Sequence, residues 1–211
     1  VSRRALRDRD RYHAFVSSAR SNLVLMDGSL PSLVAAAMVR EGRVAENGTD
    51  ALAWLIGSER MLSCAESQAE TLGLRVVAKA EPSEELCVEG TSGIVLLASA
   101  IAAARLGCGD VVWAAHCARA GSASDVDIDR VAEAIDRATL VGRLASLEAR
   151  FEIEVKTPFV DLSDQQIADL AVDMGVEPSS CWWGTGDGAA IAERRRWHRV
   201  LQERGVAAAM G

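Results

Sequence analysis

Lysine is nearly absent from this chain: Lys79 and Lys156 are the only two among 23 basic residues. Arginine therefore carries almost all of the positive charge, and any mechanism that needs a catalytic lysine has two candidates. Aromatic side chains make up only 4% of the residues. This scarcity disfavours an aromatic-rich β-sandwich and favours helices that pack through small side chains such as alanine.

Paired cysteine motifs and long apolar runs are also missing. The five cysteines are odd in number and never spaced as Cys-x-x-Cys, which argues against structural zinc and a disulfide framework and indicates a reducing compartment. The longest apolar stretch, residues 93–106, is too short to cross a membrane and contains Arg105. The N-terminal residues are charged and mixed in sign, unlike a secretory signal. We therefore expect a cytoplasmic protein that does not span a membrane.

The charge balance is acidic, with 30 acidic and 23 basic residues and a formal net charge of -7. Such a chain has no general positive field, which disfavours nucleic acid as a partner. A hydrophobic content of 49% over 211 residues is typical of a folded protein with a substantial core. These values exclude a mainly disordered chain.

Apolar runs and helical patterns alternate along the sequence. Because parallel strands need a crossover between them, this order predicts a doubly wound α/β fold with a mostly parallel central sheet. We expect an N-terminal helical extension (1–21), an α/β domain (22–180), and a C-terminal loop and basic helix (181–211) packed on the same domain. The expected strands are 22–26, 51–56, 75–80, 110–115 and 152–155, and the expected helices are 3–20, 33–41, 59–72, 94–106, 125–149, 163–174 and 189–204.

Three helical segments allow more specific expectations. Residues 94–106 are apolar on all sides, which predicts a helix deep beneath the sheet. The pattern over 125–149 includes Gly142, where a break is possible. The segment 163–174 has Ser163 or Asp161 as its candidate N-cap.

The polar loop Asp27-Gly28-Ser29-Leu30-Pro31-Ser32 joins the first strand to the first helix of the sheet domain. Backbone N–H groups and the helix dipole favour an anion at such a place, so a phosphate is one interpretation. The alternative is an ordinary turn followed by a helix that begins with proline. The loop alone does not separate the two.

Three further segments follow this loop in a suggestive order. Residues 89–107 form a Glu-Gly-Thr-Ser turn and an apolar helix, residues 157–175 begin Thr-Pro-Phe and end in Met-Gly, and residues 180–184 read Ser-Cys-Trp-Trp-Gly. Together with Gly28 and Ser32, they resemble the PP-loop ATP pyrophosphatases, specifically 7-cyano-7-deazaguanine synthase of queuosine biosynthesis. The resemblance implies an adenine nucleotide alpha hydrolase-like fold. It also implies ATP or another nucleotide as ligand and, for an active enzyme, ATP-dependent ligase chemistry that activates a carboxylate and forms an amide or nitrile.

The sequence departs from this family at positions that carry its chemistry. Pro31 stands where the family has the aspartate that holds magnesium and triphosphate, and Asp27 replaces a hydroxyl residue. Asp164 falls at the position of the family's lysine, and Cys181 is the one zinc cysteine that aligns. The resemblance therefore implies a divergent member with no zinc that retains at most the binding of a nucleotide or a deazapurine-like ligand. The candidate nucleotide-binding residues are Asp27, Gly28, Ser29 and Ser32.

Other residues leave alternatives open. Asp125 aligns with the region where the family recognises its deazaguanine substrate, and the alternative is a helix N-cap. His116 and Cys117 are adjacent in sequence, but neighbours in a strand point to opposite faces, which favours structural roles. Trp182 and Trp183 are typical of a core plug or an interface anchor.

A different class of function is a non-catalytic interaction module, a homodimer or a partner-binding subunit. Its expected contacts are the first helix, the tryptophan pair and the basic run 194–199. For that run we favour salt bridges to acidic groups over a patch that binds RNA or phosphate.

Overall fold

The computed structural model describes residues 21–42, 51–80, 93–119, 122–184 and 188–204. Five strands in these ranges form one all-parallel sheet in the order β3-β2-β1-β4-β5. This confirms the α/β fold with a parallel sheet. The strands are β1 (Asn22–Met26), β2 (Ala51–Ile56), β3 (Arg75–Ala80), β4 (Asp110–Trp113) and β5 (Glu154–Lys156).

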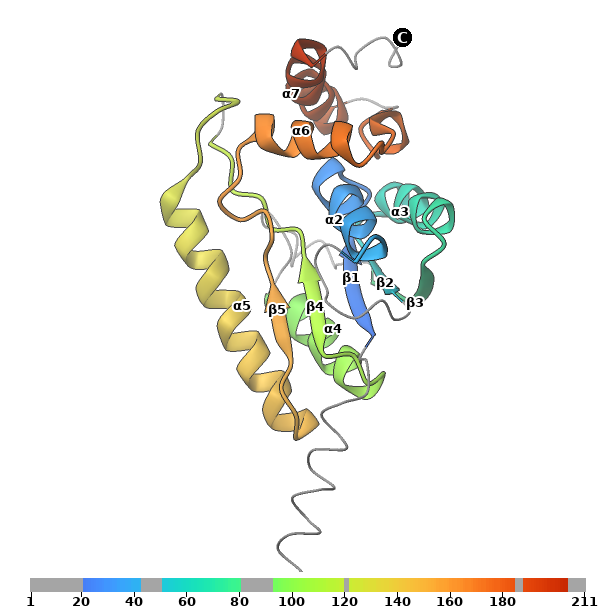
Figure 1. The fold of residues 1–211 in the computed structure, drawn as a ribbon, viewed down its shortest axis with the longest axis vertical. Coiled ribbons are helices and arrows are strands. Elements are labelled where there is room, and N and C mark those ends of the chain that lie inside the picture. Colours follow the sequence, from blue (N-terminus) through green and yellow to red (C-terminus); the bar gives the residue numbers. More distant parts are fainter. Residues whose placement is uncertain (1–20, 43–50, 81–92, 120–121, 185–187, 205–211) are drawn as a thin grey trace, which may run out of the picture.

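Helices cover both faces of the sheet, so the fold is doubly wound (Figure 1). Alternate strand residues divide the core between the two faces: Val24 and Met26 point to one side, Leu23 and Leu25 to the other. The first face carries α2 (Leu30–Arg40), α3 (Glu59–Thr71), α6 (Asp164–Asp173) and α7 (Ala189–Glu203), and the second carries α4 (Gly93–Arg105) and α5 (Ile128–Ala149).

Helix α5 runs unbroken through Gly142, the position of the possible break. A Cβ at Gly142 would lie 3.0 Å from the carbonyl oxygen of Ile153. The glycine therefore lets α5 approach the segment that leads into β5.

Helix α4 does not lie deep in the protein, and the expectation for residues 94–106 is wrong. Only one face of α4 is buried, through Leu96, Ser99, Ala100 and Ala103, while Ile94 is 64% exposed. Because the helix is apolar on all sides, its sequence does not show which side is buried. The small alanines of one side are enough to pack that single face on the sheet.

The C-terminal segment belongs to the first core. Trp183 and Trp197 have no exposed surface and pack in the same cluster as β1 and α2. The core-plug interpretation of Trp183 is therefore confirmed, and this indole is unavailable as an interface anchor. The expected helix 3–20 and the extension 1–21 lie outside the described residues, apart from Ser21. No helix in the described part combines the length and apolarity needed to span a bilayer.

Candidate functional site

The strand order identifies where an open sheet of this type binds ligands. β1 pairs with β2 on one side and with β4 on the other, and the chain covers opposite faces on its way to these two neighbours. At such a switch point the connections after the two strands diverge and leave a crevice at their carboxyl ends. The candidate site therefore lies where residues 27–29 follow β1 and residues 114–117 follow β4.

The loop after β1 is closed by hydrogen bonds between its own residues. Asp27 Oδ1 accepts the backbone N–H of Ser29 at 2.9 Å, and Ser32 Oγ accepts the N–H of Asp27 at 3.3 Å. Ser29 is the N-cap of α2, because its Oγ accepts the N–H of Ser32 at 3.4 Å. The structure thus brings the candidate residues together, but the Asp27 carboxylate already takes a backbone donor that a phosphate would use.

Gly28 anchors this loop to the rest of the protein. Its φ is +73°, and a Cβ there would lie 2.9 Å from Met61 O and 3.2 Å from Cys64 Cβ in α3. Its carbonyl oxygen accepts the N–H of Trp182 at 3.0 Å and Nε2 of Gln68 at 3.3 Å. Gly28 is therefore a packing residue here, and Ser32, 2% exposed, is likewise buried.

Cys181 lies beside this loop with its thiol buried. Burial raises the pKa of Cys181 well above its ordinary value, and the charge of Asp27 acts in the same direction. The thiol is therefore protonated at neutral pH, whereas a metal ligand must be a thiolate. Within the described ranges no group of three or more His, Cys, Asp or Glu residues could hold a metal ion. That the protein binds no zinc stays a prediction.

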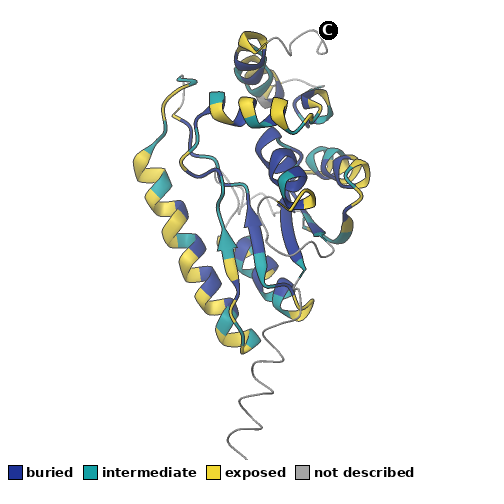
Figure 2. Ribbon diagram, in the orientation of Figure 1, coloured by how far each residue is buried: buried dark blue, intermediate teal, exposed yellow. Residues whose placement is uncertain are grey.

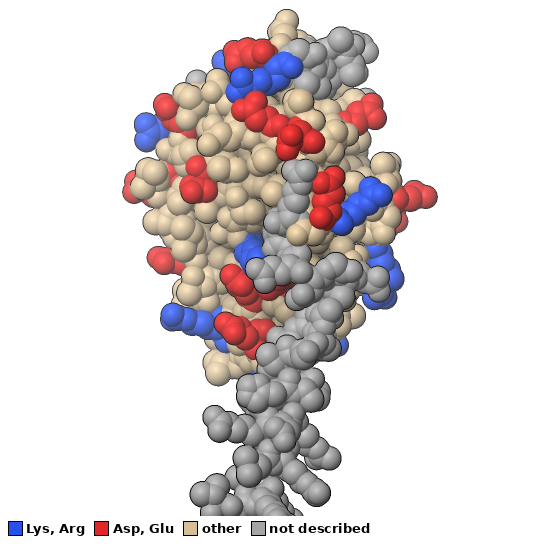
Figure 3. Space-filling model, viewed as in Figure 1, with Lys and Arg blue, Asp and Glu red and all other residues tan. Residues whose placement is uncertain are grey.

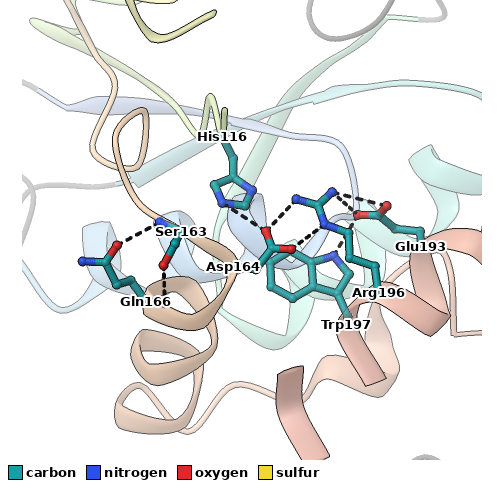
Figure 4. Close-up of polar contacts among 7 residues, drawn as sticks. All are labelled: His116, Ser163, Asp164, Gln166, Glu193, Arg196 and Trp197. Atoms are coloured by element: carbon teal, nitrogen blue, oxygen red, sulfur yellow. Dashed lines mark hydrogen bonds and ion pairs between the residues drawn. The ribbon is translucent and has the colours of Figure 1, made fainter. Parts of the chain in front are cut away.

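A buried ion pair lies beyond the end of β4. Asp164, whose side chain is 3% exposed, receives two hydrogen bonds from Arg196, from Nε at 2.7 Å and Nη2 at 2.6 Å (Figure 4). Glu193 Oε1 accepts Nη1 of Arg196 at 3.2 Å and Nε1 of Trp197 at 2.8 Å. The salt-bridge interpretation of the basic run is confirmed for Arg196.

Ser163 fixes where α6 begins and so places Asp164. Its Oγ accepts the N–H of Gln166, and the Gln166 side chain accepts the N–H of Ser163, which completes a capping box. Of the two candidate N-caps, Ser163 is therefore confirmed. Asp164 consequently lies in the first helical turn, where negative charge is favoured.

His116 completes this cluster from the end of β4. Its ring stacks on Trp197 with centroids 5.9 Å apart, and Nε2 lies 3.5 Å from Asp164 Oδ1. Burial lowers the pKa of His116 to about 4, with Asp164 opposing and Arg196 reinforcing the effect. The imidazole is thus neutral at pH 7. Cys117 lies in the core of the opposite face, so the adjacent histidine and cysteine do not form a nucleophilic pair.

Asp125 lies in an exposed connection between β4 and α5. Its carboxylate accepts a hydrogen bond from Ser124 Oγ at 3.3 Å. The N-cap of α5 is Asp127, whose side chain accepts the N–H of Arg130, so the N-cap alternative for Asp125 is wrong by two residues. No hydrogen bond between described residues joins Asp125 to the loop after β1, and its substrate-binding role stays a prediction.

The electrostatics of the site favour cations and neutral donors over phosphates. Asp27, Asp164 and Glu193 are acidic, and Arg196 is engaged with the last two. On the face seen in Figure 3, acidic and basic side chains are interspersed. The sequence singled out Asp164 as a charge reversal, but it gave no sign that Arg196 would neutralise it. The sequence contains only two signals for this ion pair: an aspartate at a predicted helix start and an arginine-rich helix.

No protein-family model matches this sequence, and no curated protein matches it. Among solved structures, the chain is similar to the U34-tRNA thiolase of Methanococcus maripaludis with its 4Fe-4S cluster, at 14% identity and a TM-score of 0.49 over 92% of this chain and 73% of that chain. The NMN synthetase of Francisella tularensis is 13% identical with a TM-score of 0.44, covering 90% and 88%. The NAD+ synthetase of Burkholderia pseudomallei is 14% identical with a TM-score of 0.29, covering 98% and 91%.

These three structures are a tRNA thiolase, an NMN synthetase and an NAD+ synthetase. None of them is a 7-cyano-7-deazaguanine synthase. The specific resemblance to that enzyme therefore stays a prediction.

The packing role of Gly28 can be tested against Gly73, because both have a positive φ, but a Cβ at Gly73 meets nothing within 4 Å. Gly73→Ala should lower the free energy of unfolding by about 1 kcal/mol, the cost of a left-handed backbone. Gly28→Ala adds overlap with α3 and should cost about 1–3 kcal/mol more. Urea denaturation measures both, and equal losses would show that the loop does not depend on this packing.

Two ion pairs join α6 to α7 and to the residue that caps its C-terminus; they differ mainly in burial and form a second matched test. Asp164→Asn leaves Arg196 without its buried partner and should lower the free energy of unfolding by about 3 kcal/mol. Asp169, 55% exposed, pairs with Arg204 at 2.7 Å. Asp169→Asn should cost only about 0–1 kcal/mol. Similar costs in urea denaturation would contradict the importance of the buried pair.

His116 should make the protein less stable in acid. Its pKa is about 4 in the folded state and about 6.5 in an unfolded chain, so between these values the unfolded state binds more protons. Its contribution is therefore complete above pH 6.5 and is lost as the pH falls toward 4, by about 3 kcal/mol at most. His116→Gln should flatten the pH dependence of urea unfolding between pH 4.5 and 7.5. An unchanged slope would show that His116 titrates normally.

Proposed function

We propose that this protein is a divergent PP-loop-type domain that binds a nucleoside or purine-like ligand at the carboxyl ends of β1 and β4. In this proposal it has lost the ATP and magnesium chemistry of 7-cyano-7-deazaguanine synthase. The observation that carries the proposal is the 2.9 Å hydrogen bond from Ser29 N–H to the Asp27 carboxylate. A protein group thereby satisfies the donor at the start of α2 that a phosphate would need.

The charge of Asp27 supports the choice of ligand. Two like charges 4 Å apart repel by about 4 kcal/mol at the effective dielectric constant near a protein surface, and each further phosphate adds to this cost. Pro31, at the position of the expected metal-binding aspartate, has no side-chain oxygen to hold a bridging cation. A carboxylate instead accepts hydrogen bonds from amino and hydroxyl groups, which a nucleoside offers.

The accessible part of the loop is small. Asp27 and Ser29 are only partly buried, whereas Gly28 and Ser32 are buried. Of the four candidate residues, we therefore assign ligand contact to Asp27 and Ser29 and a supporting role to Gly28 and Ser32. Asp125 remains a candidate acceptor for a purine amino group.

Calorimetry and thermal shift on the full chain test this proposal, because a ligand that binds only the folded state raises its melting temperature. The ligands are guanosine, a 7-deazaguanine base, GMP, AMP and ATP, each with and without magnesium. We expect the nucleoside and the base to bind without magnesium and the affinity to fall with each phosphate. Tighter binding of ATP with magnesium than of guanosine would overturn the proposal, as would a lack of binding by every ligand.

Two isosteric variants separate the roles of the carboxylates. Asp27→Asn keeps an oxygen that accepts the Ser29 N–H but removes the charge, so GMP should gain at least about tenfold in affinity relative to guanosine. Asp125→Asn should weaken guanosine about tenfold through loss of one charged hydrogen bond and leave the preference against phosphates unchanged. If Asp27→Asn does not alter that preference, charge repulsion is not its cause.

A further inference from the structure

The outer face of α5 carries exposed leucines. Leu140, Leu144 and Leu147 are 59%, 50% and 78% exposed and follow the spacing i, i+4, i+7 along one side of the helix. The opposite side of α5, including Val141 and Ala145, is buried against the sheet. Figure 2 shows the exposed side of α5 along the outer edge of the molecule. This position lies on the opposite face of the sheet from α2, α6 and α7.

This leucine stripe has the pattern of a helix that packs against another helix. Apolar residues alternating four and three apart form the seam of a coiled coil. Single exposed leucines are common on protein surfaces, but a contiguous apolar stripe flanked by charges is typical of an interaction site. Three leucines in two turns on a side that faces away from the core are not explained by the packing of the sheet.

The charges at the two ends of the stripe indicate its partner. The exposed Asp136 lies one turn before Leu140, and the exposed Arg150 follows Leu147 by three residues at the end of the helix. A second α5 in antiparallel orientation would place Asp136 of each copy near Arg150 of the other, whereas a parallel orientation would oppose like charges. Arg143, near the middle of the helix, lines the groove between α5 and residues 151–155 together with Leu147 and Arg150 of the stripe.

We propose that two copies of this chain form a homodimer through antiparallel α5 helices, with the three leucines at the centre and an Asp136–Arg150 pair at each end. This surface replaces the tryptophan pair and the basic run as the expected dimer contacts, because Trp183 and Trp197 are fully buried and Arg196 is held by Asp164. The proposal is independent of the ligand at the carboxyl ends of β1 and β4.

The oligomeric state of the full chain in solution tests the proposal. Light scattering after size exclusion should give a mass of twice the 22.4 kDa chain. Leu144→Glu places a charge at the centre of the stripe and should give the monomer. Ile94→Glu, which changes a 64% exposed apolar residue on α4, is the control and should stay dimeric. Circular dichroism verifies that both variants fold. A monomeric wild-type chain at about 100 μM, above the dissociation constant of a stable dimer, or a folded and dimeric Leu144→Glu variant, overturns the proposal.

Exchange of the end charges tests the orientation. Asp136→Arg alone and Arg150→Asp alone each create two like-charge contacts in a homodimer and should raise the dimer dissociation constant about tenfold. Mixing these two variants should form heterodimers of wild-type affinity, because every pair is then opposite in sign. A mixture that associates no better than either variant alone excludes the antiparallel α5 arrangement.

Discussion

An ionised carboxylate with 3% of its side chain exposed needs a charged partner, and this requirement fixes the position of the last helix. Asp164 opens α6 inside the protein, and α7 supplies Arg196 to it through two short hydrogen bonds. The same turn of α7 presents Trp197, which packs in the core and stacks on His116. The end of β4, the start of α6 and the middle of α7 are thus joined around one buried charge.

This pair also bears on the chemistry of the site. In the family that the sequence resembles, a lysine is expected where Asp164 stands, and a basic group there suits a phosphate ligand. Here Arg196 is paired with the carboxylates of Asp164 and Glu193, and His116 beside it is neutral at pH 7. At the neighbouring loop, the negative charge of Asp27 likewise disfavours a phosphate. The polar side chains described at the two strand ends are therefore acidic, neutral or, for Arg196, paired with carboxylates.

Local patterns predicted much of the fold. β1, β2 and β3 have the expected bounds, because each is a largely apolar run that glycine or polar residues follow in the sequence. The start of α6 was also predicted, since a capping box is encoded in four consecutive residues. The depth of α4 was not, because an evenly apolar helix contains no information about which side meets the sheet.

The position of the candidate loop was predictable, but its hydrogen bonding was not. A polar loop between a strand and a helix marks the edge of the sheet where ligands bind, and residues 27–32 do lie there. Whether the Asp27 side chain turns outward or accepts the N–H of Ser29 depends on the loop geometry set by Gly28 against α3. The pairing of Asp164 with Arg196 likewise depends on how α7 packs, which neither segment encodes alone.

The hydrogen bond between Gly28 O and Trp182 N has a consequence for folding, since it joins the first loop of the domain to a turn near its end. Most of the chain lies between these residues, and closing so long a loop is entropically costly and slow. During synthesis, the turn at residue 182 emerges only after all five strands. The loop after β1 therefore acquires its final shape only after residue 182 is made, although its own residues are made before β2.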